Sequence, residues 1–390
     1  MIQLIHGNPV AANQFSMKQT IKGIALMLAM IVATSVQIVA QEYDMKQMPP
    51  LDPAVRSGIL ENGMHYYIRV NKLPENRGEF YIAHNVGAIQ EDDDQNGLAH
   101  FTEHMAFNGT ANFPKKSMLD YLATIGVKFG TNVNAGTGVE RTVYNLSNVP
   151  LLREGIIDSA LLVLHDWSNY ISFEPAEIDL ERGVIREEWR MYGSASERMS
   201  NALAPIIYKG SKYAKRDIIG DTAVINHFKY ETIKNFYKKW YRPDMQAIVI
   251  VGDFDANMME ARIKKVFGSI PKVQNPAAKE DFPLPDNAEP LIGTASDKEA
   301  TGTIVTVYYK HDATRDSDKN LGYMRLLLIR SLINTMFGQR MIELSNRENP
   351  PFLIARCYYG QYTRNKDAFT GMAQAANNKS LTALTALLTE

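Results

Sequence analysis

The order of apolar and polar residues along the chain predicts strands and helices that alternate in groups after residue 57. Segments rich in β-branched and aromatic residues are typical of strands, and we expect strands at 58–71, 78–90, 129–136, 141–149 and 245–255. Segments with apolar residues three and four apart are typical of helices, which we expect at 116–126, 151–170, 175–192 and 231–241. Because these elements follow no regular strand–helix–strand rhythm, we expect an α+β fold in which a largely antiparallel sheet packs against helices.

A proline-rich polar stretch at 268–290 divides the chain into two predicted domains. Its five prolines and polar composition are typical of a linker. We expect a first domain at 41–267 and an incomplete second domain at 291–390. The second domain weakly repeats the order of elements in the first. We expect strands at 302–310, 352–359 and 368–376 and a helix at 320–336.

The beginning of the chain has the order of features of a secretory signal. Two lysines precede an apolar run at 24–39, and the small residue Ala40 is followed by polar residues. We expect residues 1–40 to be a signal peptide that starts at Met17, so that the mature protein is periplasmic or secreted. The alternative is an uncleaved anchor, although the run is short for a spanning helix and contains polar residues.

Charge and cysteine content exclude several classes of function. The 42 Lys and Arg residues balance 43 Asp and Glu residues, so nothing attracts the whole chain to nucleic acid or to acidic membranes. The single cysteine, Cys357, excludes an intrachain disulfide and a cysteine-based zinc cluster, and we expect it to be buried. We therefore expect no nucleic-acid partner, and no membrane partner after removal of the signal.

The C-terminal residues keep the spacing of a helix up to the last position. Leucines 381, 384, 387 and 388 share this spacing, and no capping residue follows them. We therefore expect the chain to stop inside an element, as a fragment of a longer protein that lacks its C-terminal half.

The segment "GLAHFTEHMAFNG" at 97–109 brings two histidines and a glutamate together in a predicted helix of about ten residues. On that helix His100 and His104 lie one turn apart on one face, which suits two imidazoles that bind one zinc ion. Glu103 lies beside them, where a carboxylate could take a proton from water that the metal acidifies. The alternative is a pair of surface or core histidines without a ligand role.

A tetrahedral zinc site with two histidines needs another protein ligand. The helix expected at 175–192 offers four glutamates: Glu177, Glu181, Glu187 and Glu188. Glu181 and Glu188 are seven residues apart and share a face, whereas Glu187 points about a quarter turn away. Spacing alone selects none of them as the ligand, because a charge-rich helix face is usually solvated.

Several motifs together resemble a known family. "GLAHFTEHMAFNGT", "VNAGTGVERTVY", "ERGVIREEWR" and "FYKKWYRPDMQAIVIVGDFD" are similar to successive signatures of the pitrilysin (insulinase) family of zinc peptidases. That family includes mitochondrial processing peptidases and bacterial periplasmic zinc proteases. Its hallmark is the inverted His-x-x-Glu-His order. The resemblance covers roughly residues 50–265 well and the second domain more faintly.

The resemblance implies a role for each matching residue around a single Zn²⁺ ion. His100 and His104 become zinc ligands, and Glu103 becomes the base. Glu188, the last glutamate of the "ERGVIREE" match, becomes the third ligand, with Glu187 as the less favoured alternative. The gap between His104 and Glu188 is longer than is usual in the family, which an insertion near residues 127–138 would explain.

The same resemblance implies supporting residues around the site. Glu181 resembles a family glutamate that supports the site by orienting a ligand histidine, so we place it with the catalytic machinery. "TNVNAGTG" resembles an edge strand on which a substrate peptide adds as a further strand, with Asn134 and Ala135 nearest the scissile bond. The alternative for these two residues is an ordinary, turn-rich sheet edge.

Two further features are expected to carry no chemistry. The acidic run at 91–94 could suggest calcium, but it lacks alternating ligand spacing, so we expect a solvated loop. The helix expected at 320–336 has no pair of histidine and glutamate residues, so we expect the second domain to be catalytically silent.

The favoured hypothesis is an exported zinc metalloendopeptidase that hydrolyses small or unfolded polypeptides between two halves that enclose a chamber. This fragment would hold the catalytic domain and part of an inactive partner domain. One alternative is a non-catalytic peptide-binding or scaffold member of the same family. Another is a zinc-binding protein without hydrolysis. Glu103 argues against both, because neither function needs a base beside the metal.

Overall fold

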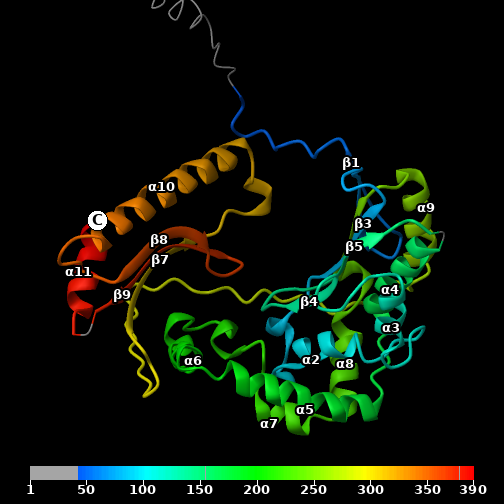
Figure 1. Ribbon diagram of the computed structural model, residues 1–390, viewed down its shortest axis with the longest axis horizontal. Coiled ribbons are helices and arrows are strands. Elements are labelled where there is room, and N and C mark those ends of the chain that lie inside the picture. The colour runs from blue at the N-terminus through cyan, green and yellow to red at the C-terminus, as the bar shows by residue number, and fades with distance from the viewer. Residues whose placement is uncertain (1–42, 154, 377) are drawn as a thin grey trace, which may run out of the picture.

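The computed structural model describes residues 43–390, apart from residues 154 and 377. It has the expected α+β fold: two β-sheets, each packed against helices, lie on opposite sides of the molecule in Figure 1. The predicted signal peptide at 1–40 lies outside the described residues. Within the described part, no helix is long and apolar enough to cross a membrane.

The first sheet has six strands in the order β1-β2-β6-β3-β5-β4. The strands are β1 (Val55–Ile59), β2 (His65–Val70), β3 (Arg77–His84), β4 (Val133–Thr137), β5 (Thr142–Pro150) and β6 (Gln246–Gly252). Neighbouring strands are antiparallel except for β2 and β6, which run parallel. Strand β4 is outermost, so its outer edge pairs with no strand in the described residues.

Eight helices accompany the first sheet in the described part of the chain. They are α2 (Leu98–Met105), α3 (Ser117–Thr124), α4 (Ile156–Asn169), α5 (Pro175–Tyr192), α6 (Ala195–Ile207), α7 (Thr222–His227), α8 (Tyr230–Trp240) and α9 (Ala256–Phe267). Helices α4 and α9 pack on the sheet, where alternate residues such as Phe80 and Ile82 of β3 and Ile250 of β6 are fully buried. This core holds the sheet in place, and the outermost strand of that sheet, β4, contacts helix α2 of the candidate site.

Helix α2 packs against β4, α5 and α8, and its end is tied to the core. Trp167 of α4 is fully buried, and its indole N–H donates to the carbonyl of Ala106 at 3.1 Å, directly after α2. A buried indole needs such a partner. The bond therefore holds the helix that carries both site histidines against the core.

Three predicted elements of the first domain differ from the structure in extent. The strand expected at 58–71 is instead the end of β1 and all of β2, because a turn in which Gly63 has a φ of 96° separates them. The strand expected at 78–90 ends at His84, because the N–H groups of Ala88 and Ile89 donate to carbonyls in the loop after β4 and a short 3-10 helix forms instead. The helix expected at 151–170 starts at Ile156, because Gly155 has a φ of 86°, which a continuous α-helix does not allow.

The second sheet has three antiparallel strands in the order β7-β9-β8. Its elements are β7 (Thr303–Asp312), α10 (Leu321–Ser345), β8 (Ile354–Gln361), β9 (Lys366–Ala375) and α11 (Ser380–Thr389). Helix α10 continues past the predicted end at residue 336. Cys357 is buried, as expected, in the small core between this sheet and its helices.

The chain between α9 and β7 contains no helix or strand among its described residues and crosses from one sheet to the other (Figure 1). It is docked to its surroundings. Leu284 is buried, and its N–H donates to the Asn365 side chain at 3.1 Å. The predicted boundaries at 41–267, 268–290 and 291–390 stay predictions.

Candidate metal centre

A buried carboxylate holds the N-terminus of helix α2. Gly97 has a φ of 101°, and a Cβ there would lie 2.8 Å from the Cα of Gly220, so glycine is required. Glu91 is fully buried and accepts N–H bonds from Gly97 at 3.0 Å and Ala99 at 2.8 Å. The prediction of a solvated loop is therefore wrong for Glu91, whose oxygens satisfy free N–H groups at the helix N-terminus. Burial raises the pKa of this carboxyl to about 8, although the bonds from Ala99 and Gly97 act in the opposite direction. The rest of that acidic run, 92–94, is exposed.

Three side chains from α2 and α5 converge beside this helix. The rings of His100 and His104 are 4.7 Å apart between centroids. Glu188 reaches across from α5, with its Oε2 3.7 Å from Nε2 of His100 and 3.4 Å from Nε2 of His104. One ligand atom from each residue lies within 4.8 Å of the others. The structure thus brings together the three ligands expected from the family resemblance.

Glu181 lies on the same face of α5 and orients one of the two imidazoles. Its Oε1 is 2.7 Å from Nδ1 of His104, and its Oε2 accepts a 2.5 Å bond from Nδ2 of Asn108. An ionised carboxylate only accepts, so Nδ1 of His104 carries the proton and Nε2 keeps its lone pair toward Glu188. Burial raises the pKa of Glu181, but the bonds from His104 and Asn108 outweigh it and hold that pKa below its ordinary value.

The protonation of the two imidazoles is set by different neighbours. Burial, and then the proximity of His104, lowers the pKa of His100 to about 4, so this imidazole is neutral at neutral pH. Burial also lowers the pKa of His104, but the Glu181 carboxylate outweighs burial and raises that pKa above its ordinary value. The neutral His100 ring therefore offers a lone pair, and His104 offers the lone pair on Nε2 when its Nδ1–H donates to Glu181.

These residues fit a divalent metal ion. Two imidazole nitrogens and one carboxylate oxygen form a common donor set for zinc. The Oε2 atom of Glu188 is buried and accepts no hydrogen bond from the described residues, although it faces both imidazoles. A buried carboxylate oxygen without a partner is unfavourable, so a cation at this point would satisfy it.

Glu103 is close enough to His104 and Glu188 to interact with their charges, but it is not one of the three side chains whose ligand atoms converge. Its Oε2 accepts a 2.5 Å bond from the hydroxyl of Thr137, the last residue of β4. Burial raises the pKa of the Glu103 carboxyl above its ordinary value, against the effect of the Thr137 bond. This carboxyl is therefore fixed at the junction of α2 and the outermost strand of the sheet.

The other predicted residues have distinct positions. Glu187 points to solvent and pairs with Arg190 at 2.7 Å, away from the converging side chains. Asn134 and Ala135 lie on β4, opposite Asn145 and Tyr144 of β5 in the strand register. Both are half-buried on the outermost strand, three and two residues before Thr137, which contacts Glu103.

Sequence reasoning missed three residues of this site: Glu91, Asn108 and Thr137. Asn108 had an available signal, because the predicted helix of about ten residues would place it on the face of His104, although α2 ends at Met105 and Asn108 lies in the turn after it. Glu91 and Thr137 had no local signal, because each meets α2 from a separate segment of the chain.

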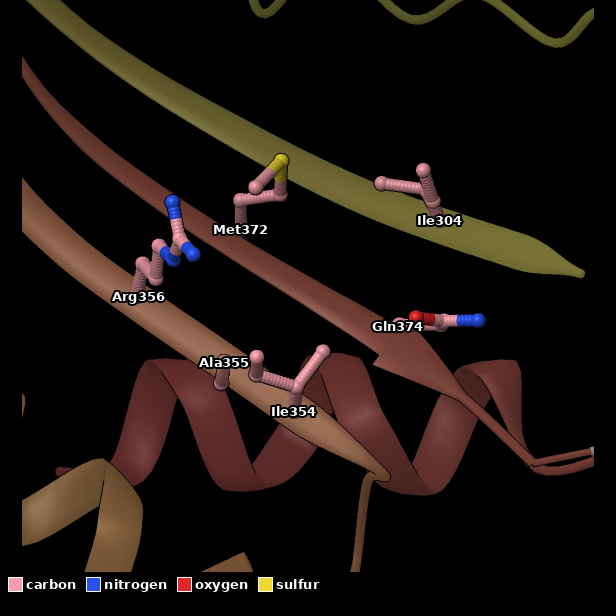
Figure 2. A pocket seen from close by; sticks show the side chains of 6 residues that line it. All are labelled: Ile304, Ile354, Ala355, Arg356, Met372 and Gln374. Atoms are coloured by element: carbon pink, nitrogen blue, oxygen red, sulfur yellow. The ribbon is translucent and has the colours of Figure 1, made fainter. Parts of the chain in front are cut away.

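A pocket on the second sheet has no metal-binding side chains in its lining. It lies on the open face of the second sheet, whose opposite face packs against α11 (Figure 2). Its lining contains no histidine or carboxylate and consists of Ile304, Ile354, Ala355, Arg356, Met372 and Gln374. It therefore offers no donors for a metal ion.

Curated relatives are similar in sequence to this chain over long stretches. The probable zinc protease PqqL of Haemophilus influenzae is 38% identical over 243 residues, covering 62% of this chain and 26% of the relative. The probable zinc protease PqqL of Escherichia coli is 32% identical over 296 residues, covering 75% of this chain and 31% of the relative. The chain thus spans less than a third of the length of these curated relatives.

A solved structure and two family profiles agree with these relatives. The crystal structure of the first half of the periplasmic protease PqqL from Escherichia coli matches with a TM-score of 0.75 and 26% identity, covering 87% of this chain and 72% of that one. The profile of the insulinase family (peptidase family M16) matches residues 71–221, which include helices α2 and α5. The profile of the peptidase M16 inactive domain matches residues 227–330. The chain therefore belongs to the insulinase family, peptidase family M16.

Proposed function

We propose that this site is the catalytic centre of a zinc-dependent endopeptidase that hydrolyses peptide bonds in small or unfolded polypeptides. The observation that carries the proposal is the convergence of His100, His104 and Glu188, with a separate carboxylate, Glu103, directly beside them. Three ligand atoms around one point support a single ion. The zinc protease names of the relatives support zinc as that ion.

Each residue of the site then has a distinct task. His100, His104 and Glu188 would hold the ion. A zinc ion bound there supplies Lewis acidity, which polarises the scissile carbonyl and makes the attacking water more acidic. Glu103 takes the proton from that water and returns it to the leaving amine. Glu181 fixes the ring of His104 through the 2.7 Å contact with Nδ1.

The free edge of β4 is the proposed place for the substrate backbone. An outermost strand presents unpaired N–H and C=O groups, so an extended peptide can add to it through main-chain hydrogen bonds. Asn134 and Ala135 would lie nearest the scissile bond. Recognition through the backbone requires no particular sequence, which suits small or unfolded polypeptides as substrates.

Glu181→Gln is expected to lower zinc affinity by about 10- to 100-fold without removing a ligand. The carboxylate now accepts from both His104 and Asn108, whereas an amide offers one acceptor and turns its NH₂ group toward the second donor. Competition with a chromophoric chelator would measure the affinity. Glu177→Gln, one turn earlier on α5, is the matched control, and equal affinities in both variants would contradict the orienting role.

We also propose that the protein is exported and acts as part of a longer chain. The relative of solved structure is described as periplasmic, and the curated relatives are more than three times as long as the matched region. The remaining length would supply the second half of an enclosing chamber. Residues 41–267 would then be the catalytic domain, and 291–390 would belong to an inactive partner domain.

The main rival is a family member that binds peptides or acts as a scaffold without cutting them. Such a protein needs the edge strand but neither the metal ligands nor Glu103. A protein that only binds zinc needs the ligands but not Glu103. The presence of all four side chains in one place favours the peptidase.

Metal removal from the full-length protein tests the proposal. We expect about one zinc per chain, cleavage of an internally quenched peptide, loss of cleavage after chelation, and recovery when zinc is restored. Zinc content by mass spectrometry and peptide fluorescence are the measurements. Zinc without any cleavage would favour the zinc-binding rival, and the absence of both would favour the scaffold.

A further inference from the structure

The carboxylate of Glu103 is held by a threonine of the same strand that would bind the substrate. The hydroxyl of Thr137 lies 2.5 Å from Oε2 of Glu103, a short distance typical of a hydrogen bond to a charged acceptor. We propose that Thr137 is a positioning residue, which occupies Oε2 and leaves Oε1 as the oxygen that faces the reacting water. This inference rests on the proposed function.

The hydrogens near this contact determine its direction. A threonine hydroxyl has one proton to donate. The neighbouring hydroxyl of Thr142 lies 3.0 Å from the carbonyl of Val86 but 3.5 Å from the hydroxyl of Thr137, so it donates to the carbonyl. The Thr137 proton is then committed to Glu103, which is the strongest acceptor among the described residues that contact this hydroxyl. The Thr137 backbone N–H also donates to Glu103, so the two bonds together fix the rotation of the carboxylate about its last torsion, and only the hydroxyl bond is lost in a Thr137→Val variant.

The position of Thr137 on β4 gives this bond a second consequence. Thr137 pairs with the fully buried Thr142 of β5, so its backbone is anchored in the sheet. The proposed substrate positions, Asn134 and Ala135, lie on the same short strand. One strand therefore aligns both the peptide and the oxygen that takes the proton, which places the two reacting groups in a common frame.

A purely structural role for Thr137 is the rival explanation. In that case its hydroxyl satisfies a half-buried carboxylate, and its loss would lower stability without a selective effect on the chemical step. The two roles differ in what they change. Misorientation of the base lowers kcat at constant KM and constant zinc content, whereas general loosening of β4 raises KM or lowers the melting temperature.

The test compares three variants of the full-length protein on an internally quenched peptide. Thr137→Val has the same shape without the hydroxyl, and Thr137→Ser keeps the hydroxyl. Thr131→Val, an exposed threonine just before β4, is the matched control. We expect Thr137→Val to lower kcat about 10-fold or more with KM within about twofold and unchanged zinc. We expect Thr137→Ser to stay within about threefold and Thr131→Val to match the wild type.

Three results would overturn the inference while the wild type cuts the peptide. They are a Thr137→Val variant with wild-type kcat, a Thr137→Ser variant that loses as much as Thr137→Val, and loss of zinc or a rise in KM that accounts for the whole effect. A wild type that binds zinc and cuts nothing contradicts the proposed function, and this inference then fails with it.

Discussion

Glu103→Gln in the full-length protein is expected to lower kcat/KM for peptide cleavage by about 10²- to 10⁴-fold, which is the usual contribution of a general base. Glutamine has the shape of glutamate, and its amide oxygen can still accept the bond from Thr137. The local structure is therefore retained. The amide cannot take a proton from water, so the chemical step loses its acceptor. Steady-state cleavage of a quenched peptide measures the loss.

Zinc content separates the base role from a ligand role for Glu103. The three converging ligand atoms come from His100, His104 and Glu188, so Glu103→Gln should bind as much zinc as the wild type. Glu187→Gln removes an exposed carboxylate from α5 and should leave both zinc content and cleavage unchanged. Cleavage by Glu103→Gln within tenfold of the wild type would contradict the base role, and loss of its zinc would make Glu103 part of the metal site.

Local periodicity predicts which site residues share a helix face, whereas the choice of Glu188 as the third ligand came from the family resemblance. The spacing of His100 and His104 predicts a shared helix face, because side chains four apart project from the same side of a helix. The same rule predicts that Glu181 and Glu188 share a face of α5, and both indeed reach α2. These relations lie within single elements, so they can be read from a single sequence.

The contact of Glu181 with His104 was implied by the family resemblance, but the contacts of Glu91 and Thr137 with α2 could not be predicted, because each joins segments that periodicity treats independently. Glu91 belongs to an acidic run of exposed appearance, and only the position of the free N–H groups of α2 explains its burial. Thr137 meets Glu103 across a separation of 34 residues. Alternation along β4 predicts a strand but does not state which side chain of another element each residue will meet.

The sheet shows the same limit at a larger scale. Both β2 and β6 have the alternation of strands, yet nothing in either segment indicates that they pair in parallel across most of the first domain. Similarly, proline content at 268–290 predicts a linker but not its contacts with the second sheet, where Leu284 is buried and bonded to Asn365. Composition describes the freedom of an isolated segment, and tertiary contacts decide how much of that freedom is kept.

Glu188→Gln and Glu187→Gln form the sharpest pair of substitutions on helix α5. The two residues are adjacent, and the chemical change is identical. Oε2 of Glu188 faces both imidazoles at 3.7 and 3.4 Å, whereas Glu187 is exposed and bonds to Arg190. An amide is a weaker, uncharged donor to zinc than a carboxylate. Glu181→Gln is expected to lower zinc affinity by about 10- to 100-fold. Glu188→Gln should lower it further, because it changes a ligand itself.

The two variants also decide between the alternatives left open by helical spacing. If Glu188 is the ligand, its variant should lose zinc during dialysis against a weak chelator and lose cleavage in parallel, while Glu187→Gln keeps both. The reverse pattern would make Glu187 the ligand and would require α5 to rotate by about a quarter turn relative to α2. Such a rotation would also separate Glu181 from His104. In that case Glu181→Gln would bind zinc as tightly as the wild type.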